Sequence, residues 1–189
     1  MGFTRAQLES FRNAEVPDLV GPELRLLFVG INPGLWTAAT QTPFAHPGNR
    51  FYPALAQAGI ISRLPSFANG LSDADRQAFL DAGIGISNLV KRATVRADEL
   101  SREELRAGAA RLTLDVAAWK PVVVAIVGVT AYRAGFGRSK ARVGKQPETL
   151  AGAQLWVVPN PSGLNAHDTV SSLATAYAEP ARAAGIVTS

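Results

Sequence analysis

The stretch that decides the fold reads LLFVGINPG at residues 26–34. Its first four residues are all apolar, which is typical of a short parallel strand buried on both faces. The five residues that follow form a polar loop rich in glycine and proline. In open α/β sheets, ligands bind beside the loops that leave the carboxyl ends of the strands. The stretch therefore predicts a central strand that ends at a binding cleft.

A second stretch near the C-terminus repeats this arrangement. It reads LWVVPNPSGLN at residues 155–165, an apolar run followed by a polar loop. Carboxyl ends of parallel strands lie at one edge of a sheet, so we expect the two loops to converge there. They would place side-chain amides, backbone N–H groups and a protruding leucine around one cleft.

The rest of the chain alternates between strand and helix patterns. Residues 122–127 are a third apolar run, and a weaker strand is expected over residues 84–90. Ser101 and Glu104 form a capping box that opens a helix, with apolar residues at helical spacing as far as Trp119.

Two further helices have recognisable ends. Ser72 is expected to cap a helix that ends near Gly83. The last helix begins near Val170 and is expected to stop or kink at Pro180. These patterns predict one domain over residues 1–189, a three-layer α/β/α sandwich around a short, mostly parallel sheet.

Composition narrows the function classes. The 189 residues are 47% hydrophobic and 18% charged, as in ordinary globular proteins. The chain has no cysteine, which excludes disulfides, thiol catalysis and thiolate-bound metals, and only two histidines, His46 and His167. We expect no metal and no cofactor, although carboxylate-bound magnesium stays open. With no signal-like or membrane-length apolar run, we expect a cytoplasmic monomer with no membrane partner.

Positive charge is concentrated in one part of the chain. The net charge is +4 at pH 7, and five basic residues occur between residues 133 and 145 with no acid among them. This stretch either follows a phosphate backbone or is a solvated loop. Its three glycines favour a loop over a basic helix. The basic residues are Arg133, Arg138, Lys140, Arg142 and Lys145.

Four motifs in this order resemble the mismatch-specific uracil-DNA glycosylases. They read GINPG at residues 30–34, FAHPGNRF at 44–51, GISNLVKRAT at 85–94 and NPSGL at 160–164. With the thymine-DNA glycosylases, these enzymes form one branch of the uracil-DNA glycosylase superfamily. The resemblance runs from about residue 26 to the last helix. It implies removal of uracil from double-stranded DNA that contains uracil or a mismatched base.

The chemistry of base removal suits the residues of these motifs. Breaking the bond between C1′ and N1 makes the sugar cation-like and puts negative charge on the departing base, which must first leave the duplex. The resemblance implies that Asn32 orients the attacking water and that preorganised dipoles supply most of the acceleration. The alternative for Asn32 is a simple turn-former before Pro33.

The resemblance also implies a base pocket. Backbone N–H groups at Gly30 and Ile31 would address the carbonyl oxygens of the base, and Phe44 would stack on its ring. Thr37 and Asn160 would border the pocket. Without the resemblance, Phe44 reads equally well as a core residue.

The C-terminal motif is expected to face DNA. Gly163 and Leu164 resemble the wedge that enters the duplex where the base has left, although such a leucine can also fold back into a core. Asn165 would contact the orphaned base, and Ser162 and Arg50 are further expected DNA contacts. Some family members carry arginine two places after the wedge leucine, where this chain has alanine. Selectivity for guanine opposite the lesion therefore stays open.

Asp98 is a further catalytic candidate. It lies between the third motif and the helix capped by Ser101. Because the amide of Asn32 is not a base, a nearby carboxylate could activate water or stabilise the sugar cation. The alternative is a charge near a helix N-terminus, where acids are favoured.

Other function classes are weaker. Ser162, His167 and Asp168 are too close in sequence for a hydrolase triad, and the chain has no G-x-S-x-G elbow. Residues 30–34 do not supply the G-x-G-x-x-G turn of dinucleotide-binding enzymes. The main alternative is a non-catalytic DNA-damage-binding module, which would share the wedge and the basic surface but leave the lesion intact.

Overall fold

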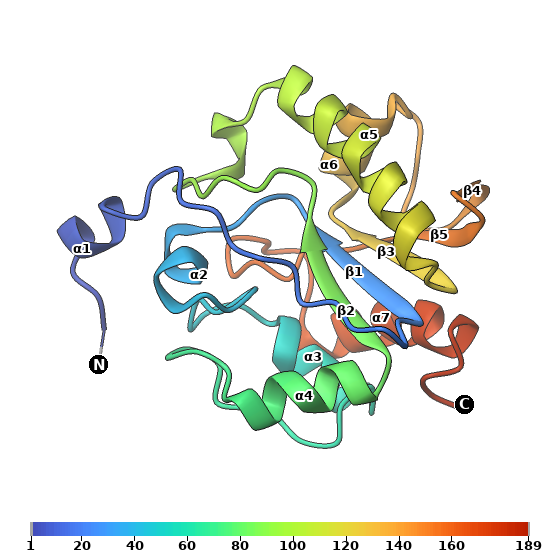
Figure 1. Cartoon of the computed structure of the whole chain (residues 1–189), viewed down its shortest axis with the longest axis horizontal. Helices are drawn as coiled ribbons and strands as arrows, with labels where there is room; N and C mark the ends of the chain where they lie inside the picture. Colours follow the sequence, from blue (N-terminus) through green and yellow to red (C-terminus); the bar gives the residue numbers. More distant parts are fainter. Residues whose placement is uncertain (1, 189) are drawn as a thin grey trace.

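A computed structural model describes residues 2–188, and its centre is a five-stranded sheet in the order β2-β1-β3-β5-β4 (Figure 1). The first four strands in this order run parallel, and β4 pairs antiparallel with β5 at the edge. The mostly parallel α/β sandwich expected from the sequence is confirmed. The strands are β1 (Leu26–Gly30), β2 (Ile84–Asn88), β3 (Val123–Val127), β4 (Gly144–Leu150) and β5 (Ala153–Val158).

Helices cover both faces of the sheet, as Figure 1 shows. Side chains of α3, α4 and α7 form one core with Leu26 and Phe28, whereas α5 and α6 pack over Leu27 and Val29 on the other face. Successive residues of β1 thus point into opposite cores, which explains why the strand is apolar at every position. The helices are α1 (Arg5–Glu9), α2 (Leu35–Thr40), α3 (Phe51–Gln57), α4 (Asp73–Asp81), α5 (Arg102–Trp119), α6 (Val129–Phe136) and α7 (Val170–Ala183), with a 3₁₀ turn, η1 (Ala97–Glu99).

The predicted helix starts are confirmed. Ser101 accepts a hydrogen bond from the Glu104 N–H at 3.0 Å, and the Glu104 carboxylate accepts one from the Ser101 N–H. Ser72 caps α4 in the same way through the Asp75 N–H. These side chains satisfy N–H groups that the helix itself leaves without partners.

Two details differ from the sequence-based expectation. The last helix does not stop at Pro180 but continues to Ala183, with Pro180 buried in it. Proline removes only one N–H, and burial of the last turn against the core offsets that loss. The basic stretch is not one loop either, because α6 includes Arg133 and β4 begins at Gly144.

Strand β4 was not predicted because its sequence is mostly polar. An edge strand pairs on one side only, so it needs few apolar residues, and only Gln146 and Leu150 are buried. Pro147 falls where the register with β5 is irregular, a position that tolerates a residue without an N–H.

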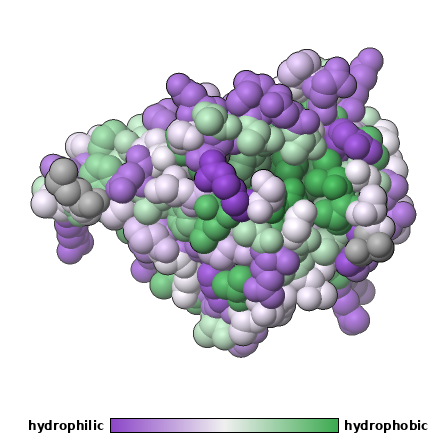
Figure 2. All heavy atoms as spheres, turned by 90° about the horizontal axis from the view of Figure 1, so that it is seen from below, coloured by the Kyte–Doolittle hydropathy of each residue, from purple (hydrophilic) through white to green (hydrophobic). Residues whose placement is uncertain are grey.

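The described surface is mixed in character. Figure 2, seen from below, shows hydrophilic side chains standing out from the surface and hydrophobic residues gathered mostly between them. None of the helices within residues 2–188 combines the length and apolarity that crossing a bilayer requires.

Candidate active site

A cleft of about 1110 Å³ lies where β1, β2, β3 and β5 end. Its walls come from both loops that the sequence singled out, together with α2 and the segments before α3 and around η1. Loops far apart in the chain therefore converge at one sheet edge, as expected for an open α/β fold. Of the residues assigned to a site from sequence, those that line it are Gly30, Ile31, Asn32, Thr37, Phe44, Asp98, Asn160, Ser162, Gly163, Leu164 and Asn165.

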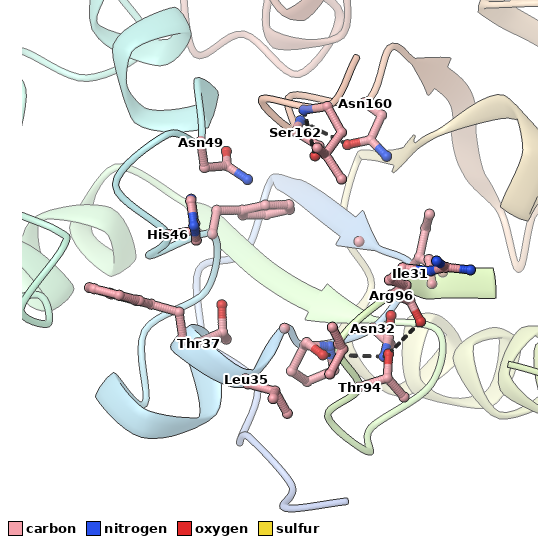
Figure 3. Close-up of a pocket in the computed structure, with 18 of the residues that line it drawn as sticks. Ile31, Asn32, Leu35, Thr37, His46, Asn49, Thr94, Arg96, Asn160 and Ser162 are labelled. Atoms are coloured by element: carbon pink, nitrogen blue, oxygen red, sulfur yellow. Dashed lines mark hydrogen bonds between the residues drawn. The ribbon is translucent and has the colours of Figure 1, made fainter. Parts of the chain in front are cut away.

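Asn32 is held in one orientation. Its side-chain nitrogen, which carries two hydrogens, has three acceptors within hydrogen-bond distance. They are the Thr94 hydroxyl at 2.8 Å (Figure 3), the Arg92 carbonyl at 3.0 Å and the Pro33 carbonyl at 3.2 Å. Carbonyl oxygens only accept hydrogen bonds, so this side of the amide must be the NH₂ group. The side-chain oxygen makes no hydrogen bond within residues 2–188, and it is the group left for a ligand or a water.

The floor of the cleft is open next to Asn88 and Phe44 because residue 30 is glycine. A Cβ atom on Gly30 would lie 2.6 Å from Asn88 Oδ1 and 3.2 Å from Phe44 Cζ. Real Cβ atoms essentially never approach another atom as closely as the first distance, so any larger residue at this position would displace the Asn88 side chain. The predicted role of Gly30 thus includes a steric one.

Phe44 both packs on the core and lines the cleft. Its ring stacks on the buried Phe51 ring, with centroids 4.1 Å apart and planes 24° from parallel. The ring is also only half-buried and lines the cleft. Phe44 has a left-handed backbone, with φ of +55°. Its core contact therefore fixes a flat apolar surface at the cleft.

Two polar groups near Phe44 have no partner among the described residues. The Asn88 side chain is only 7% exposed and lines the cleft, yet it makes no hydrogen bond within residues 2–188. The backbone N–H of Ile31 likewise donates no hydrogen bond to a group in that range. A polar group left unpaired in a half-enclosed site is available to a ligand.

The loop at residues 160–168 is tightly built. The Asn160 side-chain oxygen accepts from the Ser162 N–H at 2.9 Å, and the Ser162 hydroxyl accepts from the Leu164 N–H at 3.2 Å. Leu164 itself projects from this loop with 91% of its surface exposed. Such exposure rules out the reading in which Leu164 folds back into the core.

Close packing holds this loop against residues 46–50. A Cβ on Gly163 would lie 2.9 Å from the Gly48 carbonyl oxygen, so glycine is required here. The Arg50 guanidinium donates to the carbonyls of Ser162 and Asn165 at 2.5 and 2.8 Å, and also to those of Pro161 and Asp168. The guanidinium of Arg50, which was expected to contact DNA, therefore donates its hydrogen bonds to groups inside the protein.

Asn165 is also engaged within the loop. Its side-chain nitrogen donates to the Asn160 carbonyl and to the Asp168 carboxylate, each at 2.9 Å, and its oxygen accepts from the His167 N–H at 3.1 Å. The predicted contact with an orphaned base would require these bonds to open.

Asp98 lies at the rim of the cleft, in η1. Its carboxylate accepts two hydrogen bonds from the Arg96 guanidinium, at 2.6 and 3.0 Å, and its side chain is 64% exposed. The bond with Arg96 lowers the pKa of Asp98. The carboxylate is therefore a weak proton acceptor, pointed at Arg96 rather than held against Asn32.

Some site residues were not identified from the sequence. Asn88 and Thr94 lie inside the third motif but carried no assigned role, and the cleft also includes His46 and Asn49. The sequence did offer one signal for them, because each has a polar side chain close to the end of a strand or the start of a helix. Within residues 2–188, no three His, Cys, Asp or Glu side chains are grouped as a metal site would require.

Comparison with known proteins agrees with this arrangement. A family model described as the uracil DNA glycosylase superfamily matches residues 17–180, most of the chain and all of the cleft loops. The fold is similar to the solution NMR structure of "a putative Uracil DNA glycosylase" from Methanosarcina acetivorans. The TM-score is 0.58 and the identity 17%, over 87% of this chain and 94% of the other.

Proposed function

The chain belongs to the uracil DNA glycosylase superfamily, and from this premise we propose that it excises uracil from DNA by hydrolysis of the N-glycosidic bond. The observation that carries the proposal is the locked amide of Asn32. Three acceptors hold its nitrogen, and its oxygen alone is left to bind a water in the cleft.

The proposed reaction is a displacement at the sugar. The water oxygen forms a bond to C1′ while the bond from C1′ to N1 breaks, and the bonding electrons leave with the base. The water then loses a proton to solvent, and the base anion gains one. Asn32 accepts a hydrogen bond from the water and fixes its place, which saves the entropy of bringing the two together.

The flipped base would enter the space between Phe44 and Asn88. The Phe44 ring offers a stacking surface, and the Asn88 amide offers both a donor and an acceptor to the polar edge of a pyrimidine. The free N–H of Ile31 would stabilise negative charge on a carbonyl oxygen of the leaving base.

The exposure of Leu164 and the stiff loop beneath it support the proposed wedge role. An apolar side chain that fills the gap left by a flipped base offsets part of the unstacking cost. The loop beneath Leu164 is stiffened by Arg50 and by the close approach of Gly163 to Gly48. Arg50 would therefore act on DNA through the position of this loop.

Within the superfamily, the motifs favour the mismatch-specific and thymine-DNA glycosylase branch, with uracil opposite guanine as the first substrate. A G:U pair is weaker than a normal pair, so extrusion costs less there. Thymine and ethenocytosine are further candidates. The buried Thr37 lines the pocket and would limit the size of the base it accepts.

The test uses duplexes with one uracil opposite guanine or adenine, followed by alkali and gel analysis. We expect alkali-sensitive strand breaks at uracil, formed fastest opposite guanine. Asn32→Ala should slow single-turnover excision by about 100-fold or more while binding is retained. The matched control is Gln77→Ala, an exposed polar residue on α4, which should behave as wild type.

Two results would count against the proposal. A wild-type protein that binds the uracil duplex but leaves no alkali-sensitive site would be a non-catalytic binder of damaged DNA. An Asn32→Ala variant with the wild-type rate would remove the assigned role of the amide.

A further inference from the structure

Residues 3–15 precede the part of the chain that matches the superfamily, yet they pack beside the cleft. The Phe3 ring meets the Trp36 ring edge-on, with centroids 5.0 Å apart. Leu8 lines the cleft, and Leu8, Phe11 and Ala14 pack against a small core of Val16, Leu35, Ala38 and Ala93. We call residues 3–15 the N-terminal segment.

This segment pairs with the backbone next to the site. The Asn13 N–H donates to the Ala93 carbonyl, and the Ala93 N–H donates to the Ala14 carbonyl, both at 2.9 Å. The Asn13 side-chain oxygen also accepts from Arg92 at 3.1 Å. The segment thus pairs with both backbone polar groups of Ala93 and with the side chain of Arg92.

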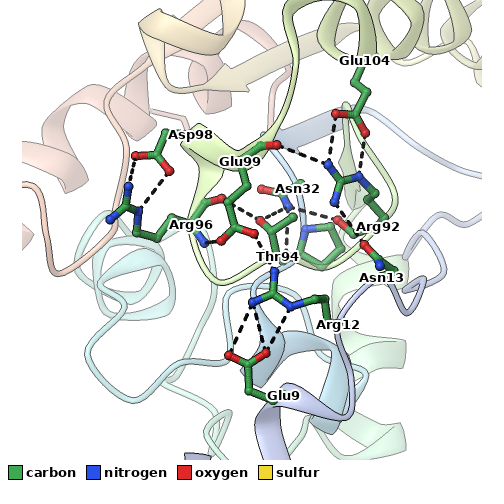
Figure 4. A network of polar contacts seen from close by, with 11 residues as sticks. Glu9, Arg12, Asn13, Asn32, Arg92, Thr94, Arg96, Asp98, Glu99 and Glu104 are labelled. Carbon is green, nitrogen blue, oxygen red and sulfur yellow. Dashed lines mark hydrogen bonds and ion pairs between the residues drawn. The ribbon is translucent and has the colours of Figure 1, made fainter.

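Arg12 forms a second connection between the N-terminal segment and the site. Its guanidinium contacts Glu99 at 2.7 Å and Glu9 at 3.1 Å, and Glu99 in turn accepts from the Arg96 N–H at 2.9 Å (Figure 4). The Arg96 carbonyl then accepts a hydrogen bond from the Thr94 hydroxyl at 2.8 Å.

The pairing at residues 92–93 and the chain of contacts from Arg12 both end on the groups that bind the Asn32 side chain. The Arg92 carbonyl and the Thr94 hydroxyl are two of the three acceptors of its side-chain nitrogen. We infer that the N-terminal segment is a positioning element for the reaction: it braces residues 92–99 and so fixes the amide of Asn32. This inference rests on the proposed function.

The consequence is kinetic rather than a matter of DNA affinity. Loss of the brace would let the acceptors shift, and a misplaced water costs rate because attack needs close alignment. None of these contacts uses the exposed wedge, so binding to DNA should change little.

The test compares Arg12→Ala with Arg5→Ala, an exposed arginine of α1 with no ion pair among the described residues. We expect Arg12→Ala to lower the maximal single-turnover rate by about tenfold with an unchanged Kd for DNA. Arg5→Ala should have no effect, and Arg12→Lys should restore part of the rate.

A double-mutant cycle tests whether Arg12 acts on the reaction through Asn32. In an Asn32→Ala background, Arg12→Ala should cause no further loss, because the group it positions is gone. An equal loss in both backgrounds would overturn the inference, and so would an effect on Kd alone or no effect on rate.

A second measurement does not depend on excision. Deletion of residues 2–12 should speed hydrogen exchange at the Ala93 and Thr94 amides, whereas Arg5→Ala should not. Unchanged exchange would overturn the brace. If the wild-type protein excised no uracil, the proposed function would fail, and the exchange rates would still decide whether the segment holds residues 92–99.

Discussion

The Thr94 hydroxyl lies 2.8 Å from the Asn32 side-chain nitrogen and points its own proton at the Arg96 carbonyl. Because that proton is committed, the Thr94 oxygen can only accept from Asn32. Thr94 is 1% exposed, so water does not compete for this contact. The buried Thr94 hydroxyl and the carbonyls of Arg92 and Pro33 together fix which end of the Asn32 amide faces the cleft.

Replacement of Thr94 should show how much its hydroxyl contributes to the excision rate and how much to the stability of the fold. Thr94→Val keeps the shape but removes the acceptor, and we expect about tenfold slower single-turnover excision. The loss of a buried hydrogen bond should lower the free energy of unfolding by about 1–2 kcal/mol, measured by denaturant titration. Thr94→Ser should stay close to wild type, and an unaltered rate in Thr94→Val would show that the hydroxyl does not position Asn32.

Leu164→Ala should impair excision from stable duplexes most and from single strands least, because single strands need no unpairing. Leu114→Ala is the matched control, since Leu114 is 73% exposed on α5. Neither change should alter the melting temperature by much. An equal loss on both substrates would contradict the wedge.

Asp98→Asn decides between the two readings of Asp98. Since its carboxylate is exposed and paired with Arg96 rather than with Asn32, we expect the excision rate to stay close to wild type. Loss of an exposed ion pair should also change the stability little. A rate loss of two orders of magnitude beside an unchanged melting temperature would instead establish the catalytic role that the sequence suggested. Single-turnover rates and thermal melts of the same preparation make the comparison.

The basic residues near β4 should contribute to DNA affinity. Gly144 pairs with Val157 near the carboxyl end of β5, so Arg142 and Lys145 lie toward the cleft edge of the sheet. The slope of log K against log salt should become shallower by about 0.9 for each phosphate contact that is lost. We expect this for Arg142→Gln and not for Lys120→Gln, which lies before β3 at the opposite edge. Identical slopes would assign these residues to a solvated surface.

Glu104 should make the fold sensitive to acid. The hydrogen bonds from Arg92 and from the Ser101 N–H lower its pKa to about 2. A carboxyl whose pKa is depressed in the folded state adds stability above its ordinary pKa, and this stability is lost as the pH falls toward 2. Between pH 4.5 and 2, wild type should therefore lose more stability than Glu104→Gln. Glu103→Gln, an exposed neighbour, should follow wild type.

Patterns of neighbouring residues in the sequence determined where the main strands and helices form. The apolar run of β1 predicts a strand buried on both faces, and Ser101 with Glu104 predicts the start of α5 because capping needs only residues three apart. The loops after β1 and β5 were placed at one cleft since parallel strands share an edge.

Tertiary structure alone decided which partners the polar side chains around the cleft have. Arg50 reads as a DNA contact in the sequence, but carbonyls more than 100 residues away occupy its donors. The lock on Asn32 joins residues about 60 positions apart, and β4 exists through its pairing with β5. Hydrogen bonds depend on distance and direction in space, and spacing along a chain carries neither once the partners lie on different elements.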